Sequence, residues 1–348
     1  MIYSFFMKGE KHMEIRRIQM TGGSSYIVTL PKEWIKKLKI QKNDPIGLIN
    51  QSDGTLLLTP KIDREHTQKT KELDVENITN QDFLLRKLIA GYISGYNSIV
   101  LKSSKRMSPQ AKMTVRKFTQ NTIGQEIVEE TDTKIIIKDI LNPAEMPFER
   151  TIKRMHIIVK SMHEDIMIAI QRKDKKLAED VLARDNEVDR LHWLVARQHN
   201  IILQNISFAE KMGITIELAA TSFLISRIIE RIGDHVIRIA KNAVNITDTK
   251  INEDMIEKLQ NASSLSLQIF NQSITSFLRR NVKSANETID SVLSLETKCK
   301  EINRLILKQK GEYVISIGYV VESIRRIGEY SSDISESVIN HIVGMEKQ

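Results

Sequence analysis

The longest regular pattern in the chain runs from about residue 145 to residue 345, where apolar residues recur every three or four positions. This spacing places them on one face of a helix and predicts a bundle of amphipathic helices. Breaks in the pattern divide it into six helices, whose ends are defined to within several residues. The predicted helices span residues 145–171, 174–200, 210–246, 251–279, 283–309 and 312–344.

Residues 13–61 show short β-rich runs between turn residues instead. The glycine turn Thr21–Ser24 separates two such runs and predicts a hairpin. Pro31 suits the first turn of a short helix, because proline lacks the amide hydrogen that would be unpaired there. A turn at Ser52–Gly54 predicts a second hairpin. The resulting order is ββαββ, with strands near 15–20, 25–30, 46–49 and 55–59 and a helix at 31–38.

Residues 64–79 are polar and charged without an apolar period, and we interpret them as a linker. The following pattern predicts a small α/β unit over residues 76–142, in which we find no catalytic constellation. Its expected elements are helices at 81–92 and 109–120, a strand at 98–102 and a hairpin within 127–137. The fold class expected for the whole chain is therefore multidomain α+β, in which the helices are mostly antiparallel.

Composition and charge narrow the class of protein. A chain of 348 residues suggests two or three domains, and an aromatic content of only 5% favours helices packed with aliphatic residues. The single cysteine, Cys299, excludes an intramolecular disulfide and a zinc ribbon, and it fits a reducing cytosol. No apolar run approaches the roughly 20 residues that span a bilayer, so we expect a cytoplasmic protein without a transmembrane segment. The net charge of +8 permits contact with nucleic acid but does not require it.

Candidate chemistry is concentrated in acidic pairs of the helical region. Glu230 and Asp234 lie four residues apart and therefore share one helix face, together with Phe223 and Ile237. A carboxylate that is partly removed from water and left unpaired costs on the order of several kcal/mol. These acids therefore need a partner, which could be an arginine, a proton or a metal ion.

A second pair, Asp185 and Asp189, occupies one face of the preceding predicted helix. Two such pairs on adjacent helices would bring four carboxylates together, and these can coexist only if they are protonated or neutralised by a cation. An oxygen-rich set suits hard ions such as Fe³⁺, Mn²⁺, Mg²⁺ or Ca²⁺. His192 lies on the same face, as a further candidate ligand or as a hydrogen-bonding group behind the ligands. The alternative is a surface helix whose acids form salt bridges with Arg184, Arg190 or Arg231.

The helical region also contains an internal repeat. The stretch Glu230–His235, ERIGDH, is echoed by RRIGEY at Arg325–Tyr330, and Glu187–Leu191 is echoed by Glu301–Leu305 in the same order. Two echoes in one order indicate a duplication. We expect one three-helix repeat at 145–246 and a second at 251–345.

Residues 13–61 resemble the SpoVT/AbrB-type swapped-hairpin domain, through the turn glycines Gly22 and Gly23, the stretch Val28–Trp34, and Asp53–Gly54. In that family two chains interleave their strands into one barrel, so the resemblance implies a homodimer whose basic face commonly binds DNA. A half barrel of this size also buries too little apolar surface to be stable alone. The expected DNA contacts are Arg16, Arg17, Ser24, Lys32, Lys36 and Lys37.

One departure from that family pattern concerns the turn Thr21–Ser24, which has no arginine where family members often place one. The departure puts sequence-specific reading of bases in doubt. The alternative is a barrel that only dimerises and carries solvated lysines.

The helical region resembles the PhoU family of phosphate-uptake regulators, through Asp185–Asp189 (DNEVD) and Glu230–His235 in paired three-helix repeats. Acidic motifs of that family bind multinuclear metal clusters. Carried over by motif position, the ligands are Asp185, Asp189, Glu230 and Asp234, with iron favoured by the resemblance and manganese, magnesium, calcium or zinc as alternatives. The corresponding positions of the second repeat are Cys299, Asn303, Arg325 and Glu329.

This second set replaces most of the acids by neutral or cationic groups, so we expect no second equivalent metal cluster. Arg325 is expected to pair with Glu322 or Glu329, which lie three residues before it and four after it.

The two resemblances together imply a dimeric, metal-binding regulator of phosphate uptake and phosphate homeostasis that binds DNA. The alternative is an adaptor that dimerises through the barrel and modulates a phosphate ABC transporter, through its ATPase, or a phosphate-responsive sensor protein. An enzyme is not expected, because no Glu-x-x-His pair is repeated and no nucleophile has an adjacent base.

Overall fold

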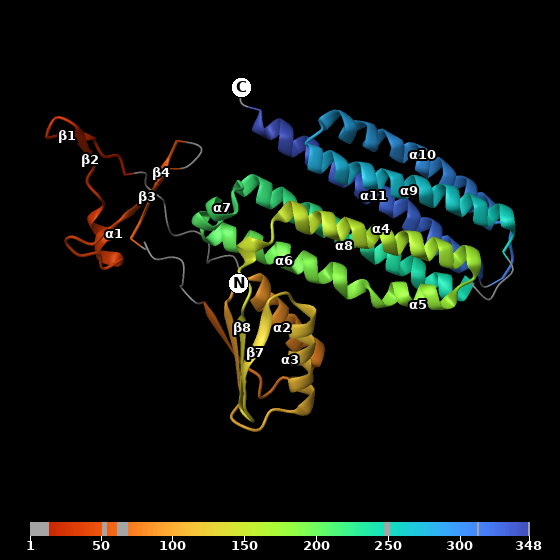
Figure 1. Cartoon of the computed structure of the whole chain (residues 1–348), viewed down its shortest axis with the longest axis horizontal. Helices are drawn as coiled ribbons and strands as arrows, with labels where there is room; N and C mark the ends of the chain where they lie inside the picture. The colour runs from red at the N-terminus through yellow and green to blue at the C-terminus, as the bar shows by residue number, and fades with distance from the viewer. Residues whose placement is uncertain (1–13, 51–53, 61–68, 247–250, 312, 347–348) are drawn as a thin grey trace, which may run out of the picture. The chain divides into compact units, whose positions relative to one another are not determined.

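The computed structural model describes residues 14–50, 54–60, 69–246, 251–311 and 313–346. Its chain divides into two compact units, Met1–Thr67 and Gln68–Gln348 (Figure 1). Among the described residues, no helix is long and apolar enough to cross a membrane.

The N-terminal unit has the predicted ββαββ order. Its first hairpin closes at Gly22 and Gly23, whose φ angles of 60° and 81° favour glycine because a β-carbon is unfavourable there. Both strands of this hairpin are shorter than predicted, and Asp53 of the second predicted turn lies outside the described residues. The elements are β1 (Gln19–Thr21), β2 (Ser25–Ile27), α1 (Lys32–Lys37), β3 (Gly47–Asn50) and β4 (Leu56–Thr59).

This unit has almost no interior of its own. Thr59 is the only residue classed as buried among its described residues. Large apolar side chains are exposed instead, at positions that include Ile15, Tyr26 and Leu48. Apolar surface on this scale in a small unit supports the expectation that a second chain covers it.

The second unit begins with a four-stranded sheet in the order β5-β6-β8-β7. β5 and β6 are parallel, whereas β8 is antiparallel to both β6 and β7. Helices α2 and α3 cover one face of the sheet, where Leu84, Phe118 and Ile99 belong to one buried cluster (Figure 1). The elements are β5 (Thr70–Asp74), α2 (Gln81–Ile93), β6 (Ser98–Lys102), α3 (Pro109–Asn121), β7 (Gln125–Glu130) and β8 (Lys134–Asp139).

The predicted helices, strand and hairpin of this α/β unit are confirmed, but the linker prediction for residues 64–79 is wrong in part. β5 lies inside that stretch and pairs with β6. Of its residues, Leu73 alone is buried, so the apolar alternation that marks a strand is missing from the sequence. β5 is therefore stabilised by its pairing with β6 and not by an apolar face of its own. The part of the predicted linker at residues 61–68 lies outside the described residues.

After the short 3₁₀ turn Pro143–Glu145, long helices run side by side in a bundle (Figure 1). The expected helical pattern is confirmed, but two predicted helices are divided. The predicted helix at 174–200 breaks at Arg184, and a short α7 precedes α8. The helices are α4 (Phe148–Arg172), α5 (Lys175–Ala183), α6 (Asp185–Gln204), α7 (Ile206–Met212), α8 (Ile216–Ile246), α9 (Glu253–Arg279), α10 (Val282–Ile306) and α11 (Tyr313–Met345).

α6 is fastened to the α/β unit by polar side chains of its C-terminal half. The guanidinium of Arg197 is fully buried and donates to the carbonyls of Tyr92 and Tyr96 at 2.6 and 3.0 Å and to Asp139 at 2.6 Å. Asn200 donates to the carbonyl of Ile93 at 3.0 Å. These donors pair carbonyls at and beyond the end of α2, where helical partners run out. α6 is therefore held in place near one end while its other end carries the predicted acids.

Candidate functional site

The four predicted acids come from two helices that pack against each other, α6 and α8. Asp185 is the first residue of α6, and Asp189 lies one turn further on. Glu230 and Asp234 lie in the middle of α8. Each pair keeps the four-residue spacing that places both carboxylates on one face of a helix.

The electrostatics of the site couple the two acidic pairs to each other. Burial, together with the carboxylates of Asp185, Glu230 and Asp234, raises the pKa of Asp189 to about 7. Burial also raises the pKa of Asp185, Glu230 and Asp234, although nearby cations oppose the rise. Asp185, Asp189 and Glu230 are half-buried, and Asp234 is exposed. The structure therefore places the four carboxylates that the sequence singled out within electrostatic range of one another.

Salt bridges within the bundle do not neutralise these acids. Arg184 pairs with Asp165 at 2.6 Å and with Asp180 at 3.2 Å. The Arg231 guanidinium lies over the ring of Tyr330, with 5.8 Å between its carbon and the ring centre. Within the part of the chain that the structure describes, none of the four carboxylates has an ion-pair partner within 4 Å or a hydrogen-bond donor.

Lys241 is a charged neighbour of the acids that the sequence reasoning missed. Its charge lowers the pKa of Asp185 and of Asp234. It follows Asp234 by seven residues, which is two helical turns, so the spacing would have placed it on the same face of α8. Lys241 limits the negative potential of the site from one side.

His192 is positioned by contacts with Ser226 and Phe223 of α8. Its Nδ1 lies 3.1 Å from the Ser226 hydroxyl, and its ring stacks on Phe223 with 5.9 Å between ring centres. Burial lowers the pKa of His192 to about 4, so the ring is neutral at physiological pH. One ring nitrogen is thus engaged by Ser226, and Nε2 is the atom that remains for a ligand.

The donor set fits a hard metal cation in its chemistry. Four carboxylates supply oxygen ligands only, and a cation among them would remove the mutual repulsion that raises the pKa of Asp189. In the structure as described, no three His, Cys, Asp or Glu side chains stand close enough to hold a metal ion together. Ligation would therefore require the carboxylates to rotate towards one another.

The second repeat has a different arrangement at the equivalent positions. The Arg325 guanidinium donates to Glu322 at 2.8 and 2.9 Å and also bonds to Glu329. Arg326 donates to the same two carboxylates at 3.0 and 3.1 Å. Burial raises the pKa of the Cys299 thiol to about 11, so it is protonated. The predicted internal salt bridge of Arg325 is confirmed, and a guanidinium stands where the first repeat has Glu230.

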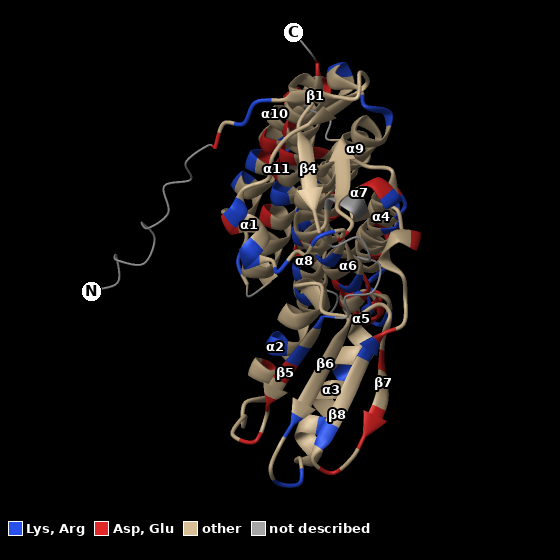
Figure 2. Cartoon of the chain, turned by 90° about the vertical axis from the view of Figure 1, so that its left-hand side faces the viewer, with Lys and Arg blue, Asp and Glu red and all other residues tan. Residues whose placement is uncertain are grey.

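The predicted nucleic-acid contacts lie on exposed positions of the N-terminal unit. Lys32, Lys36 and Lys37 belong to the short helix α1, whose basic residues are visible in Figure 2. Arg16 is paired with Glu14 two residues earlier. Ser24 lies in the turn between β1 and β2 and, like Arg17, is exposed. Exposure at these positions permits contact with DNA but does not test it, so the DNA contacts stay a prediction.

Comparison with protein-family models gives two matches along the chain. A PhoU domain model matches residues 152–243. The model of MazE, a bacterial antitoxin described as "Antidote-toxin recognition", matches residues 19–65. The two matched segments are the helical region that holds the four acids and the ββαββ unit.

Curated relatives match more than half of the chain. A phosphate-specific transport system accessory protein PhoU homolog of Clostridium acetobutylicum is 22% identical over 207 residues, which cover 56% of this chain and 90% of the relative. PhoU homolog 1 of Thermotoga maritima is also 22% identical, over 54% of this chain and 82% of the relative. Both relatives are named as accessory proteins of phosphate-specific transport systems.

A solved structure shares the fold of the helical region. PhoU from Pseudomonas aeruginosa aligns with a TM-score of 0.51 and 18% identity over 57% of this chain and 96% of its own.

Proposed function

We propose that this chain, a distant PhoU homologue that joins a PhoU domain to an N-terminal swapped-hairpin domain of the MazE/AbrB type, is a metal-binding regulator of phosphate uptake and phosphate homeostasis. It acts as a homodimer through the N-terminal unit, which also binds DNA. Asp185, Asp189, Glu230 and Asp234 hold the metal ion or cluster, and iron is the metal that the family resemblance favours.

The observation that supports the proposal is the electrostatic coupling of two acidic pairs in the segment that matches the PhoU domain model. Their positions follow from two acidic pairs on packed helices, and no described residue neutralises them by direct contact. When bound, the metal supplies positive charge that permits four carboxylates to ionise side by side. The residues of the chain supply oxygen ligands, and the packing of α6 against α8 keeps the ligands in one place.

The metal part of the proposal is tested by elemental analysis of the purified protein. The double variant Asp189→Ala with Asp234→Ala should lose most of the bound metal, because one ligand is removed from each helix. A suitable control is Asp290→Ala on α10, an exposed acid outside the site, which should keep the metal. Equal metal content in all three proteins would exclude these carboxylates as ligands.

The DNA part is tested by gel-shift titration over a series of salt concentrations. Contacts to phosphates release counterions, so affinity should fall steeply as salt rises. A combined change of Lys32, Lys36 and Lys37 to Ala should weaken binding and flatten this salt dependence. Absence of binding even at low salt would rule out DNA as a partner.

A second candidate function is an adaptor that dimerises through the N-terminal unit and acts on a phosphate ABC transporter or a sensor protein. Two observations favour it: the turn Thr21–Ser24 lacks an arginine, and Arg16 is already paired with Glu14. Copurification of the full chain with a transporter ATPase, without any DNA shift, would select this function over the first.

A further inference from the structure

Helix α8 packs against α6 and α11 and leaves one narrow stripe of residues exposed. These residues are separated by three and four positions in alternation, which places them on one line along the helix. Four of them carry a positive charge, and the fifth is an acid of the candidate metal site. The α8 stripe, as we name it, consists of Arg227, Arg231, Asp234, Arg238 and Lys241.

The cations of the α8 stripe are not paired with acids of the bundle. Elsewhere in the bundle exposed lysines contact an acid one turn away on their own helix, as Lys258 of α9 does with Asp254 at 3.3 Å. Within the residues that the structure describes, no carboxylate lies within 4 Å of any of the four cations. Arg231 contacts the ring of Tyr330, which leaves its charge in place. The four positive charges can therefore meet acids of a partner.

The same cations act at longer range on the acids of the candidate metal site. Burial raises the pKa of Glu230, and the charges of Arg231 and Arg227 lower it. Burial and Asp185 raise the pKa of Asp234, and three of the four cations oppose this rise. When all of these groups are ionised, the four acids balance the four cations of the stripe. A positive ion bound among the acids would remove this balance and leave the α8 stripe strongly positive.

We propose that the α8 stripe docks an acidic helix of a partner protein, and that a metal ion at the four carboxylates strengthens this docking. The docking rests on the metal part of the proposed function. Its first support is charge, because a row of unpaired cations attracts a partner with acids and repels a basic one. Its second support is linkage. Two ligands that attract each other across neighbouring sites raise each other's affinity by the same factor.

Two features of the α8 stripe favour a protein helix over nucleic acid as the occupant. Asp234 interrupts the cations, and a nucleic-acid backbone carries a negative charge at every phosphate, whereas a helix can present acids only where cations face them. Leu224 continues the same line one turn before Arg227 and is 47% exposed, so it offers apolar contact that a phosphate backbone cannot use. The alternation of three and four residues also matches the side chains of a facing helix.

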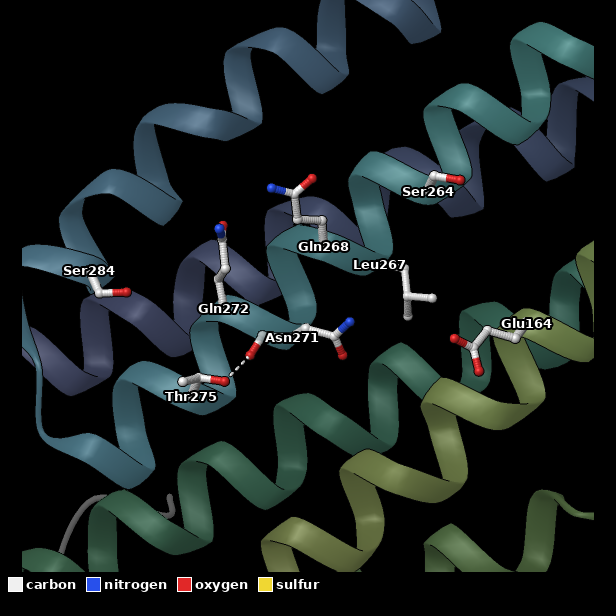
Figure 3. A pocket seen from close by; sticks show the side chains of 8 residues that line it. All are labelled: Glu164, Ser264, Leu267, Gln268, Asn271, Gln272, Thr275 and Ser284. Carbon is white, nitrogen blue, oxygen red and sulfur yellow. Dashed lines mark hydrogen bonds between the residues drawn. The ribbon is translucent and has the colours of Figure 1, made fainter.

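The exposed face of α9 offers a place for a reporter dye on a different helix. Figure 3 shows Gln268 projecting from α9 beside a shallow depression, whose lining includes amides, hydroxyls, Leu267 and the acid Glu164. No lysine or arginine is among the described residues that line it, so an acidic peptide is not attracted there. The native Cys299 is 1% exposed and will not react, so the dye can be attached at Gln268→Cys.

Thermophoresis of the dye-labelled full chain measures the docking. The probe is a synthetic alanine-based helical peptide that carries Glu at heptad positions a and d. Chain loaded with Mn²⁺ and freed of unbound metal should bind it severalfold more tightly than chain treated with a chelator. Arg227→Gln with Arg238→Gln should weaken binding to the loaded chain by roughly tenfold. The control, Arg154→Gln with Lys298→Gln, removes the same charge from exposed positions of α4 and α10 and should change the affinity little.

Two results of this titration would overturn the proposal. One is an equal loss of peptide affinity in the stripe variant and in the control. The other is a DNA duplex that binds more tightly than the peptide and is released by the stripe variant, because the α8 stripe would then serve nucleic acid. Circular dichroism confirms that both variants are folded.

Calorimetric titration with Mn²⁺ gives the reciprocal measurement, without any peptide. Arg227→Gln with Arg238→Gln removes two positive charges that repel a metal ion, so this variant should bind Mn²⁺ about threefold to tenfold more tightly than the unmodified chain. The control variant should keep the original affinity. Equal Mn²⁺ affinity in the two variants would overturn the link between stripe and metal while the metal site itself stands. Absence of Mn²⁺ binding in the unmodified chain would instead remove the metal site, and the proposed docking with it.

Discussion

Arg197 of α6 and Asp139 of β8 form an ion pair with 2.6 Å between Nη2 and Oδ2, and their side chains are only 1% and 3% exposed. The guanidinium also lies over the ring of Tyr92, 4.9 Å from its centre. Burial raises the pKa of Asp139 even though Arg197 opposes the rise. A charge this deep in the protein is tolerated only while its partner is present.

Removal of Asp139 should therefore be strongly destabilising. We expect Asp139→Ala to lower the free energy of unfolding by about 3–5 kcal/mol, because it leaves the Arg197 guanidinium buried without its counter-ion. Glu72→Ala, at the exposed pair with Lys102, should cost only about 0–1 kcal/mol. Chemical denaturation followed by circular dichroism measures both changes. Similar losses in the two variants would contradict the role of the buried pair.

The acidic site should make the stability of the metal-free protein depend on pH. The pKa of Asp189 is about 7 in the folded chain and roughly 3.9 in an unfolded one. The folded state therefore binds more protons between these values, and stability should fall as pH rises from about 4 to about 7. Melting temperatures measured with a chelator over this range should decline.

The variant Asp189→Asn is the control for that decline. It removes the titrating group while it keeps nearly the same shape, so its melting temperature should fall less over the same pH interval. An unchanged pH profile would show that Asp189 does not titrate near neutral pH. Because protons and metal compete for the carboxylates, metal affinity of the unmodified chain should rise with pH over the same interval.

The two repeats should differ in their need for acids at equivalent positions. Asp234 belongs to the four-carboxylate site, whereas Glu329 is bonded to Arg325 and Arg326. We expect Asp234→Ala to reduce the bound metal severalfold and Glu329→Ala to leave it unchanged. Titration with Mn²⁺ followed by calorimetry would give the stoichiometry. Loss of metal in Glu329→Ala would mean that the second repeat also binds an ion.

Much of the architecture could be predicted because it rests on periodic patterns. The helical spacing gave the bundle, and the echo of Glu230–His235 at Arg325–Tyr330 gave the equivalence of α8 and α11. Each acidic pair could be placed on one helix face in advance, because a four-residue spacing fixes that face without any knowledge of the tertiary structure. The guanidinium at Arg325 was predictable for the same reason, since its partners lie on its own helix.

Features that depend on contacts distant in sequence could not be predicted. β5 has one buried residue and takes its conformation from its pairing with β6. Arg197 resembles an ordinary surface arginine of a helix until the carbonyls at the end of α2 surround it. The break at Arg184 carries no proline or glycine that would mark it. In each case the conformation or burial depends on contacts with residues distant in sequence, which a local pattern does not record.

Gly233 and Gly328 occupy equivalent positions of the two repeats but have different neighbours. A β-carbon at Gly328 would collide with the side chain of Leu295, which is fully buried on α10. At Gly233 the nearest atoms, from Val159 and Val188, are 3.6 Å away, which is ordinary contact. We expect Gly328→Ala to destabilise the chain by about 1–3 kcal/mol through overpacking. Gly233→Ala should be neutral or stabilising by up to about 1 kcal/mol, because alanine favours the helix. Thermal unfolding of the two variants side by side measures the difference, and equal effects would show that α10 does not approach α11 as closely as the structure places it.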